Sequence, residues 1–155
     1  MPLSVNDPAP DFTLPSTSGE DFQLSDLKGQ AVVLYFYPKD FTGVCTKEAC
    51  AFRDQFMAFR NLDVSVFGIS KDDLETHHRF KDKYELPFEL LADTEGKVTK
   101  KYKVAIPIIG MPRRITYVLD TGHKVKAVIE DMFNADVHIK EALEKIREGK
   151  LESDG

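Results

Sequence analysis

The chain has 155 residues, 42% hydrophobic and 30% charged, and a net charge of −5, as expected for one soluble globular domain over residues 1–155. Acidic and basic residues alternate without a basic stripe, which argues against a nucleic-acid partner. The longest apolar run, residues 31–38, is too short to cross a bilayer, and the first ten residues lack a signal-peptide pattern, so we expect no membrane partner and a cytoplasmic location.

The first predicted elements form an N-terminal β-hairpin. Two short alternating segments, 12–14 and 22–24, flank the turn-forming residues 16–19. Residues 25–29 are typical of a short capped turn. Residues 31–37 are continuously apolar, β-branched and aromatic, which predicts a central strand covered on both faces.

A helix and a second buried strand are expected next. The helix covers about residues 42–60, and the strand covers residues 63–70. Ser70 is in a position to cap the following helix, with Asp73 as the third residue of a capping box. That helix is predicted to run to about Tyr84.

The second half of the chain contains shorter elements. We predict a strand near 89–92, a helix at 97–102 and a Pro- and Gly-rich loop at 105–111. Two further strands, 115–119 and 124–129, flank a turn with the composition of a hairpin loop.

A final helix begins near Asp136 and is expected to bury one apolar face, made of Val137, Ile139, Ala142, Leu143 and Ile146. After Gly149 the tail, at roughly 150–155, is expected to fray. The order of elements predicts an α/β fold with a central mixed β-sheet flanked by helices.

The two cysteines, Cys45 and Cys50, are the main clue to function. Cys45 falls at the start of the predicted helix, where unpaired N–H groups and the helix dipole stabilise a thiolate. In a helix that turns 100° per residue, Cys45 begins the apolar stripe, and Cys50 lies about 140° away on a more solvent-exposed face. Their Cα atoms would be roughly 8–9 Å apart in an intact helix, whereas a disulfide needs about 4.4–6.8 Å. A bond between them therefore requires the first helical turns to unwind.

Two simpler interpretations compete with a reactive thiol. A cysteine on an apolar helical stripe is usually a small core residue, and a cysteine pair can hold a structural zinc. The helix start, the preceding loop and the second cysteine together favour reactivity. The histidines, His77, His78, His123 and His138, are scattered and expected to be solvated, so we expect no metal and no cofactor.

Pro38, Thr42 and Cys45 reproduce a Pro-x3-Thr-x2-Cys motif that resembles the active site of the peroxiredoxins. The surrounding residues 35–50 resemble the bacterioferritin comigratory protein, or Q-type, branch with an atypical 2-Cys arrangement. The segments 9–12 and 114–120 extend the resemblance over nearly the whole chain. It implies a thioredoxin-like fold, reduction of hydrogen peroxide and organic hydroperoxides, and a part in antioxidant defence.

The resemblance also implies a role for each site residue. Cys45 would be the peroxidatic cysteine, oxidised to a sulfenic acid. Cys50 would resolve it as an intramolecular disulfide, which thioredoxin or a glutaredoxin-like dithiol reduces. Thr42 would donate a hydrogen bond to the thiolate or the peroxide, Arg114 would stabilise the thiolate and the departing oxygen, and Pro38 would shield the sulfur. Members of this branch are often monomers, so we expect a monomer or a weak dimer.

Three of these assignments have simpler explanations when taken alone. Thr42 is also a good N-cap, and Pro38 also ends a strand. Arg114 could lie at the surface, and the adjacent Arg113 leaves the register of the match ambiguous.

One difference from the family pattern concerns the residues before Cys45. The branch usually has Pro-Gly between the threonine and the cysteine, where this chain has Gly43-Val44. This difference bears on the preferred peroxide and on how easily the helix start unwinds.

Two other functions are compatible with a cysteine pair. A thiol–disulfide oxidoreductase of the same fold usually carries Cys-x-x-Cys, whereas four residues separate the cysteines here. A redox-sensing module that exposes a binding surface on oxidation is the second alternative.

Overall fold

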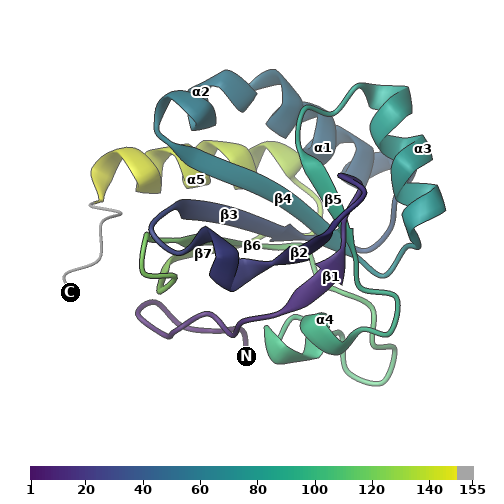
Figure 1. Cartoon of the computed structure of the whole chain (residues 1–155), viewed down its shortest axis with the longest axis horizontal. Coiled ribbons are helices and arrows are strands. Elements are labelled where there is room, and N and C mark those ends of the chain that lie inside the picture. Colours follow the sequence, from purple (N-terminus) through teal and green to yellow (C-terminus); the bar gives the residue numbers. More distant parts are fainter. Residues whose placement is uncertain (150–155) are drawn as a thin grey trace.

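A five-stranded mixed sheet forms the centre of the computed structural model, which describes residues 1–149 (Figure 1). The predicted frayed tail lies outside the described residues. The strand order is β5-β4-β3-β6-β7. Strands β3, β4 and β5 run parallel, while β6 is antiparallel to β3 and β7 is antiparallel to β6. The strands are β3 Ala31–Phe36, β4 Val64–Ser70, β5 Glu89–Ala92, β6 Ile115–Leu119 and β7 Val125–Glu130.

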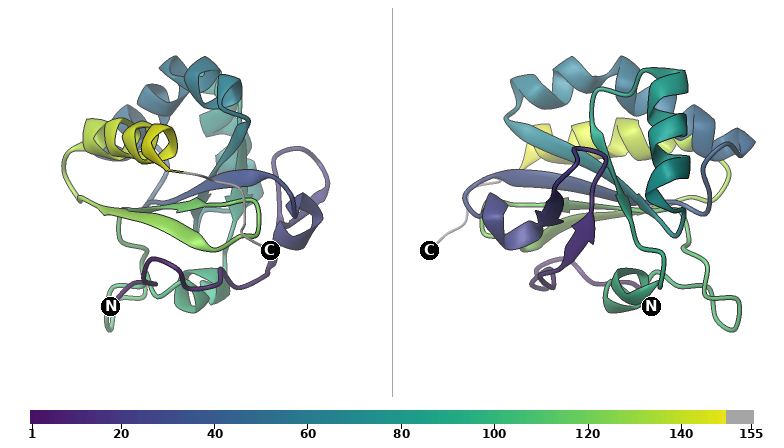
Figure 2. Two further views of the ribbon diagram at one scale, coloured as in Figure 1. Left: turned by 90° about the vertical axis from the view of Figure 1, so that its left-hand side faces the viewer. Right: turned by 45° about the vertical axis from the view of Figure 1, so that its right-hand side comes forward.

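Most of the helices cover one face of this sheet, and the N-terminal segment and the short helix Lys97–Lys101 cover the other (Figures 1 and 2). The hairpin of β1 (Thr13–Pro15) and β2 (Asp21–Gln23) is confirmed, and a 3₁₀ helix (Leu24–Leu27) follows it. The helices are α1 Gly43–Asp54, α2 Phe56–Asn61, α3 Leu74–Tyr84, α4 Lys97–Lys101 and α5 Ala135–Glu148. No helix among the described residues combines the length and the apolar character needed to span a membrane.

Strand β3 belongs to two hydrophobic cores because both of its faces are covered. Val33 and Tyr35 pack in the core beneath α1, α2 and α5. Val32 and Leu34 point to the opposite core, which the hairpin and α4 close. All six residues of β3 are buried, as the continuous apolar run predicts.

The single helix predicted over 42–60 is wrong, because the chain forms two helices that meet at Gln55. A straight helix would place Phe52, Phe56 and Phe59 on one stripe. In the structure Phe52 and Phe59 are buried with their ring centroids 5.6 Å apart, and Phe56 is half-buried. The break at Gln55 thus leaves Phe52 and Phe59 in the same core and Phe56 at its margin.

The predicted cap of the next helix is also displaced. Ser70 is the last residue of β4, and the N-cap of α3 is Asp73, whose carboxylate accepts the N–H of Thr76 at 2.8 Å. A carboxylate is a good acceptor at the positive end of a helix. The Ser70 hydroxyl instead donates to Asp72 at 2.5 Å.

The prediction that the histidines are solvated is wrong for three of the four. His77, His123 and His138 are at most 2% exposed, and only His78 is exposed. Each buried ring has at least one hydrogen-bond partner inside the protein, which offsets part of the loss of water. The sequence does not reveal these partners, because they lie outside the local segment of each histidine, from 7 residues away for Asp131 to 93 for Gln30.

Candidate active site

Cys45 lies at the junction of β3 and α1, as predicted. Strand β3 ends at Phe36, a loop follows, and α1 begins at Gly43, so Cys45 is the third residue of the helix. Its side chain is 1% exposed and joins the core cluster that contains Tyr35, Tyr37 and Phe52. The sulfur therefore lies in an apolar environment beside a helix N-terminus.

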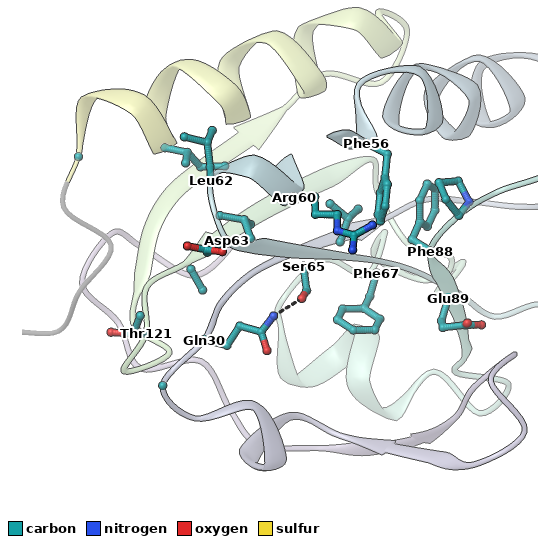
Figure 3. Close-up of a pocket in the computed structure, with 17 residues that line it drawn as sticks. Gln30, Phe56, Arg60, Leu62, Asp63, Ser65, Phe67, Phe88, Glu89 and Thr121 are labelled. Carbon is teal, nitrogen blue, oxygen red and sulfur yellow. Dashed lines mark hydrogen bonds between the residues drawn. The ribbon is translucent and has the colours of Figure 1, made fainter. Parts of the chain in front are cut away.

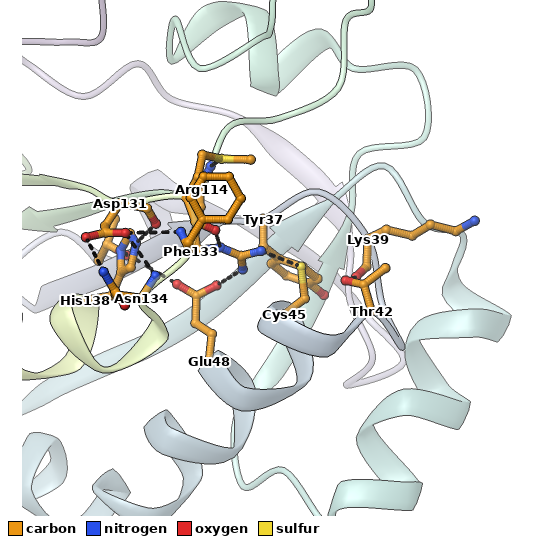
Figure 4. Close-up of polar contacts among 12 residues, drawn as sticks. Tyr37, Lys39, Thr42, Cys45, Glu48, Arg114, Asp131, Phe133, Asn134 and His138 are labelled. Atoms are coloured by element: carbon orange, nitrogen blue, oxygen red, sulfur yellow. Dashed lines mark hydrogen bonds and ion pairs between the residues drawn. The ribbon is translucent and has the colours of Figure 1, made fainter.

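Arg114 brings a positive charge to this sulfur (Figure 4). Its Nη2 donates to Cys45 Sγ at 3.0 Å, its Nη1 donates to Glu48 Oε1 at 2.8 Å, and its Nε donates to the carbonyl of Met132 at 3.0 Å. Arg114 is 3% exposed, so little water competes for these bonds. Arg113 points elsewhere, with Nη1 3.7 Å from a Glu130 oxygen, so Arg114 and not Arg113 reaches the sulfur of Cys45.

Glu48 is a site residue that the sequence reasoning missed. It lies on α1 three residues after Cys45, on the same helical face, and it is fully buried. Its Oε1 pairs with Arg114, whereas its Oε2 has no hydrogen-bond partner among the described residues. A carboxylate beside the apolar stripe is the signal that could have revealed it.

Burial and charge act in opposite directions on this pair. Burial raises the pKa of Glu48 to about 8, although the positive charge of Arg114 partly counteracts the effect. Burial lowers the pKa of Arg114, but Glu48 and Cys45 more than compensate and raise it above its ordinary value. Arg114 thus remains a cation that faces two acidic groups.

His138 lies behind Glu48 and connects α5 to the site. Its Nε2 lies 2.7 Å from the carbonyl of Asp131, and its Nδ1 lies 2.8 Å from the hydroxyl of Thr116. A carbonyl only accepts, so Nε2 carries the proton and Nδ1 accepts from Thr116. Burial lowers the pKa of His138, which favours this neutral form. The free oxygen of Glu48 lies 3.7 Å from Nδ1.

Thr42 and Pro38 lie on the loop before Cys45, but the hydroxyl of Thr42 does not donate to the sulfur. It donates to the carbonyl of Lys39 at 2.8 Å (Figure 4). Thr42 is the N-cap residue of α1, without a side-chain capping bond. Its oxygen lone pairs are still able to accept a hydrogen bond. Pro38 follows the strand and is half-buried.

Cys50 lies further along the intact α1, and both cysteines are free thiols. It is half-buried, whereas Cys45 is buried, which confirms the predicted difference between the two faces of the helix. One exposed aromatic side chain near the site is Phe133, at 81%. Phe133 lies beside Arg114 in Figure 4.

A groove of about 1170 Å³ lies beside the first residues of β3 and β4, away from Cys45 (Figure 3). The ladder between β4 and β5 starts at Phe67, so residues 64–66 pair only with β3. Side chains of Arg60, Asp63 and Pro87 contribute to the lining. The residues that line this groove include no cysteine, so we place the redox chemistry at Cys45.

Comparisons with known proteins agree with this geometry. Residues 5–128 match the AhpC/TSA family. The chain is 45% identical over 142 residues to peroxiredoxin Q, chloroplastic, of Oryza sativa subsp. japonica, covering 91% of this chain and 65% of that protein. It is 45% identical over 139 residues to peroxiredoxin Q, chloroplastic, of Sedum lineare, covering 89% of this chain and 75% of that protein.

The crystal structure of peroxidoxin BcpB from Mycobacterium tuberculosis superimposes with a TM-score of 0.87 at 38% identity, covering 93% of this chain and 96% of that chain. The predicted thioredoxin-like arrangement, with its central mixed sheet and N-terminal hairpin, is therefore confirmed.

Proposed function

Because the chain belongs to the AhpC/TSA family, in its peroxiredoxin Q branch, we propose that it reduces peroxides through Cys45. The observation that carries the proposal is the 3.0 Å hydrogen bond from Arg114 Nη2 to the Cys45 sulfur, inside a site that excludes most water. A cationic donor favours the thiolate, which is the nucleophilic form of cysteine.

In the first step the Cys45 thiolate attacks one oxygen of a hydroperoxide. An S–O bond forms, the O–O bond breaks, and the sulfur is oxidised to a sulfenic acid while the peroxide is reduced. The other oxygen leaves with its electron pair and takes up a proton, which gives water or an alcohol. In this proposal Arg114, which already donates to the sulfur, stabilises the negative charge that grows on the departing oxygen. The Thr42 hydroxyl, which donates to Lys39, orients the incoming hydroperoxide through its remaining lone pairs.

In the second step Cys50 attacks the sulfenic sulfur of Cys45. A disulfide forms, and the hydroxyl group leaves as water after taking up a proton. This step requires the first turns of α1 to unwind, because a helix holds residues five apart too far from each other. We propose that thioredoxin or a glutaredoxin-like dithiol then reduces the disulfide, in a cytoplasmic compartment that keeps thiols reduced.

The test is rapid mixing of the reduced protein with hydrogen peroxide. We expect saturable formation of a Cys45–Cys50 disulfide, much faster than the oxidation of a free thiol. Cys45→Ser should abolish the reaction, and Cys50→Ser should retain one turnover per thiol and stop at the sulfenic acid. Oxidation no faster than that of free cysteine would refute the peroxidase proposal and leave a thiol–disulfide exchange enzyme or a redox sensor.

A further inference from the structure

A buried acid–base pair, Asp40 and His77, holds the loop that leads into α1. Both side chains are at most 2% exposed. His77 Nδ1 lies 2.6 Å from Asp40 Oδ2, and the hydroxyl of Tyr37 donates to Asp40 Oδ1 at 2.6 Å. The backbone N–H of Asp40 donates to Asp72 Oδ2 at 2.9 Å. Asp40 thus makes three hydrogen bonds, two through its carboxylate and one through its backbone N–H.

Both ring nitrogens of His77 face acceptors. Nε2 lies 3.0 Å from the carbonyl of Leu91, which only accepts, so Nε2 carries a proton. A second proton lies between Nδ1 and Asp40, because two bare acceptors would repel each other at 2.6 Å. Asp40, Asp72 and His77 are close enough together to suggest a metal site. We interpret them as a hydrogen-bonded cluster, because neither histidine nitrogen has a free lone pair for a metal ion.

The pair connects four parts of the fold just in front of Cys45. Asp40 is on the loop between β3 and α1, His77 on α3, Leu91 on β5, and Asp72 between β4 and α3. The next residue, Phe41, has a left-handed backbone with φ 65, which costs free energy for a residue other than glycine. Its ring packs edge-on against Phe80 of α3, with centroids 5.0 Å apart. The surrounding contacts therefore hold a strained loop in place.

We propose that Asp40 and His77 are positioning residues that hold this loop and so set how easily the first turn of α1 unwinds. The inference rests on the proposed function, in which Cys50 can reach Cys45 only after unwinding. A strong pair keeps Cys45 beside Arg114 for the reaction with peroxide. A weaker pair favours the unwound state and therefore the disulfide.

The substitution Asp40→Asn tests the charge with little change of shape. Its amide oxygen can still accept from Tyr37, and its amide nitrogen can donate to a neutral His77 that keeps its bond to Leu91. A neutral hydrogen bond replaces a charge-assisted one, and charge-assisted bonds are about twice as strong. We expect the unwinding equilibrium to shift by roughly fivefold to tenfold.

The measurement is hydrogen–deuterium exchange over residues 41–50 of the reduced protein. Asp40→Asn should exchange roughly fivefold to tenfold faster than the wild type. His78→Gln, a change at the exposed neighbouring histidine, should exchange at the wild-type rate. If Asp40→Asn fails to fold, Asp72→Asn is the second variant. It weakens only the hydrogen bonds that Asp72 makes with the Asp40 N–H and with Ser70, so it should give a smaller increase in the exchange rate. Unchanged exchange in the folded variants would overturn the inference.

A second readout separates this role from general destabilisation. After a pulse of peroxide, Asp40→Asn should form the disulfide faster and accumulate less sulfinic acid, since the sulfenic acid is resolved sooner. Simple loss of stability would raise exchange across the whole chain instead of at residues 41–50. The exchange experiment needs no peroxide, so it still tests the Asp40–His77 pair if the wild type proves not to be a peroxidase.

Discussion

Replacing Glu48 by Gln should make the stability of the protein less sensitive to pH. Glu48 is fully buried, its Oε1 pairs with Arg114 at 2.8 Å, and its Oε2 has no partner among the described residues. The buried environment therefore favours the protonated carboxyl group. Glutamine is similar in shape and does not titrate.

The magnitude follows from proton linkage. The pKa of Glu48 rises from an ordinary 4.5 to about 8 in the folded state, chiefly through burial. Between these two values the folded chain retains a proton that the unfolded chain has lost, so the free energy of unfolding falls as pH rises. One such proton changes it by about 1.4 kcal/mol per pH unit, or roughly 4 kcal/mol between pH 5 and 8. The contribution is fully present below pH 4.5 and is lost as pH rises through about 8.

Urea denaturation of the reduced proteins at pH 5, 6, 7 and 8 provides the assay. The substitution also alters the hydrogen bond that Glu48 accepts from Arg114, which shifts the stability of Glu48→Gln at every pH. The informative quantity is therefore the slope of the free energy of unfolding against pH. We expect the variant to gain several kcal/mol relative to the wild type as pH rises from 5 to 8. Glu141→Gln, at an exposed position of α5, is the matched control and should follow the wild type. Parallel slopes for Glu48→Gln and the wild type would refute the reasoning.

Three further substitutions test the site and the core. Arg114→Lys should slow the reaction of Cys45 with peroxide by roughly 10- to 100-fold in stopped-flow measurements, because an ammonium group lacks the planar fork that makes the three bonds of Arg114. An unchanged rate would contradict the role of Arg114. Gly43 is the first residue of α1, and an added Cβ there would meet open space. Gly43→Pro should therefore stabilise the protein by roughly 0.5–1 kcal/mol and slow disulfide formation. A loss of stability would count against this expectation. In Gly68→Ala the new Cβ would lie 2.6 Å from the Tyr35 ring, so urea denaturation should show a loss of about 1–3 kcal/mol, and equal stability would be inconsistent with the packing.

Local sequence patterns predicted most of the fold. The strand expected over 31–37 and the hairpin around residues 120–123 match β3 and the turn between β6 and β7 closely, because runs of apolar residues and turn-forming residues act over short distances. The position of Cys45 at the start of a buried helical stripe follows in the same way. The break at Gln55 was not predictable, because the sequence there has no Gly or Pro to mark it.

Long-range partners explain what the sequence did not reveal about the site. Helical spacing puts Glu48 beside the apolar stripe, but only the structure shows that its partner is Arg114, 66 residues further on. His77 likewise acquires its place through Asp40, 37 residues away. Helical spacing identifies which residues share a face, but not which charged groups come to meet them from other elements.

The short pairing of β5 with β4 has a consequence for solubility. Residues 64–66 leave one row of backbone N–H and C=O groups without a strand partner among the described residues, and such an edge is a template for aggregation. Asp63, with a left-handed backbone at φ 58, places a charge where the strand begins. Arg60 adds a second charge, and Pro87 cannot donate to a ladder. Charged residues and proline at a strand edge oppose edge-to-edge association, so we expect these three residues to lower that risk at the end of the sheet remote from Cys45.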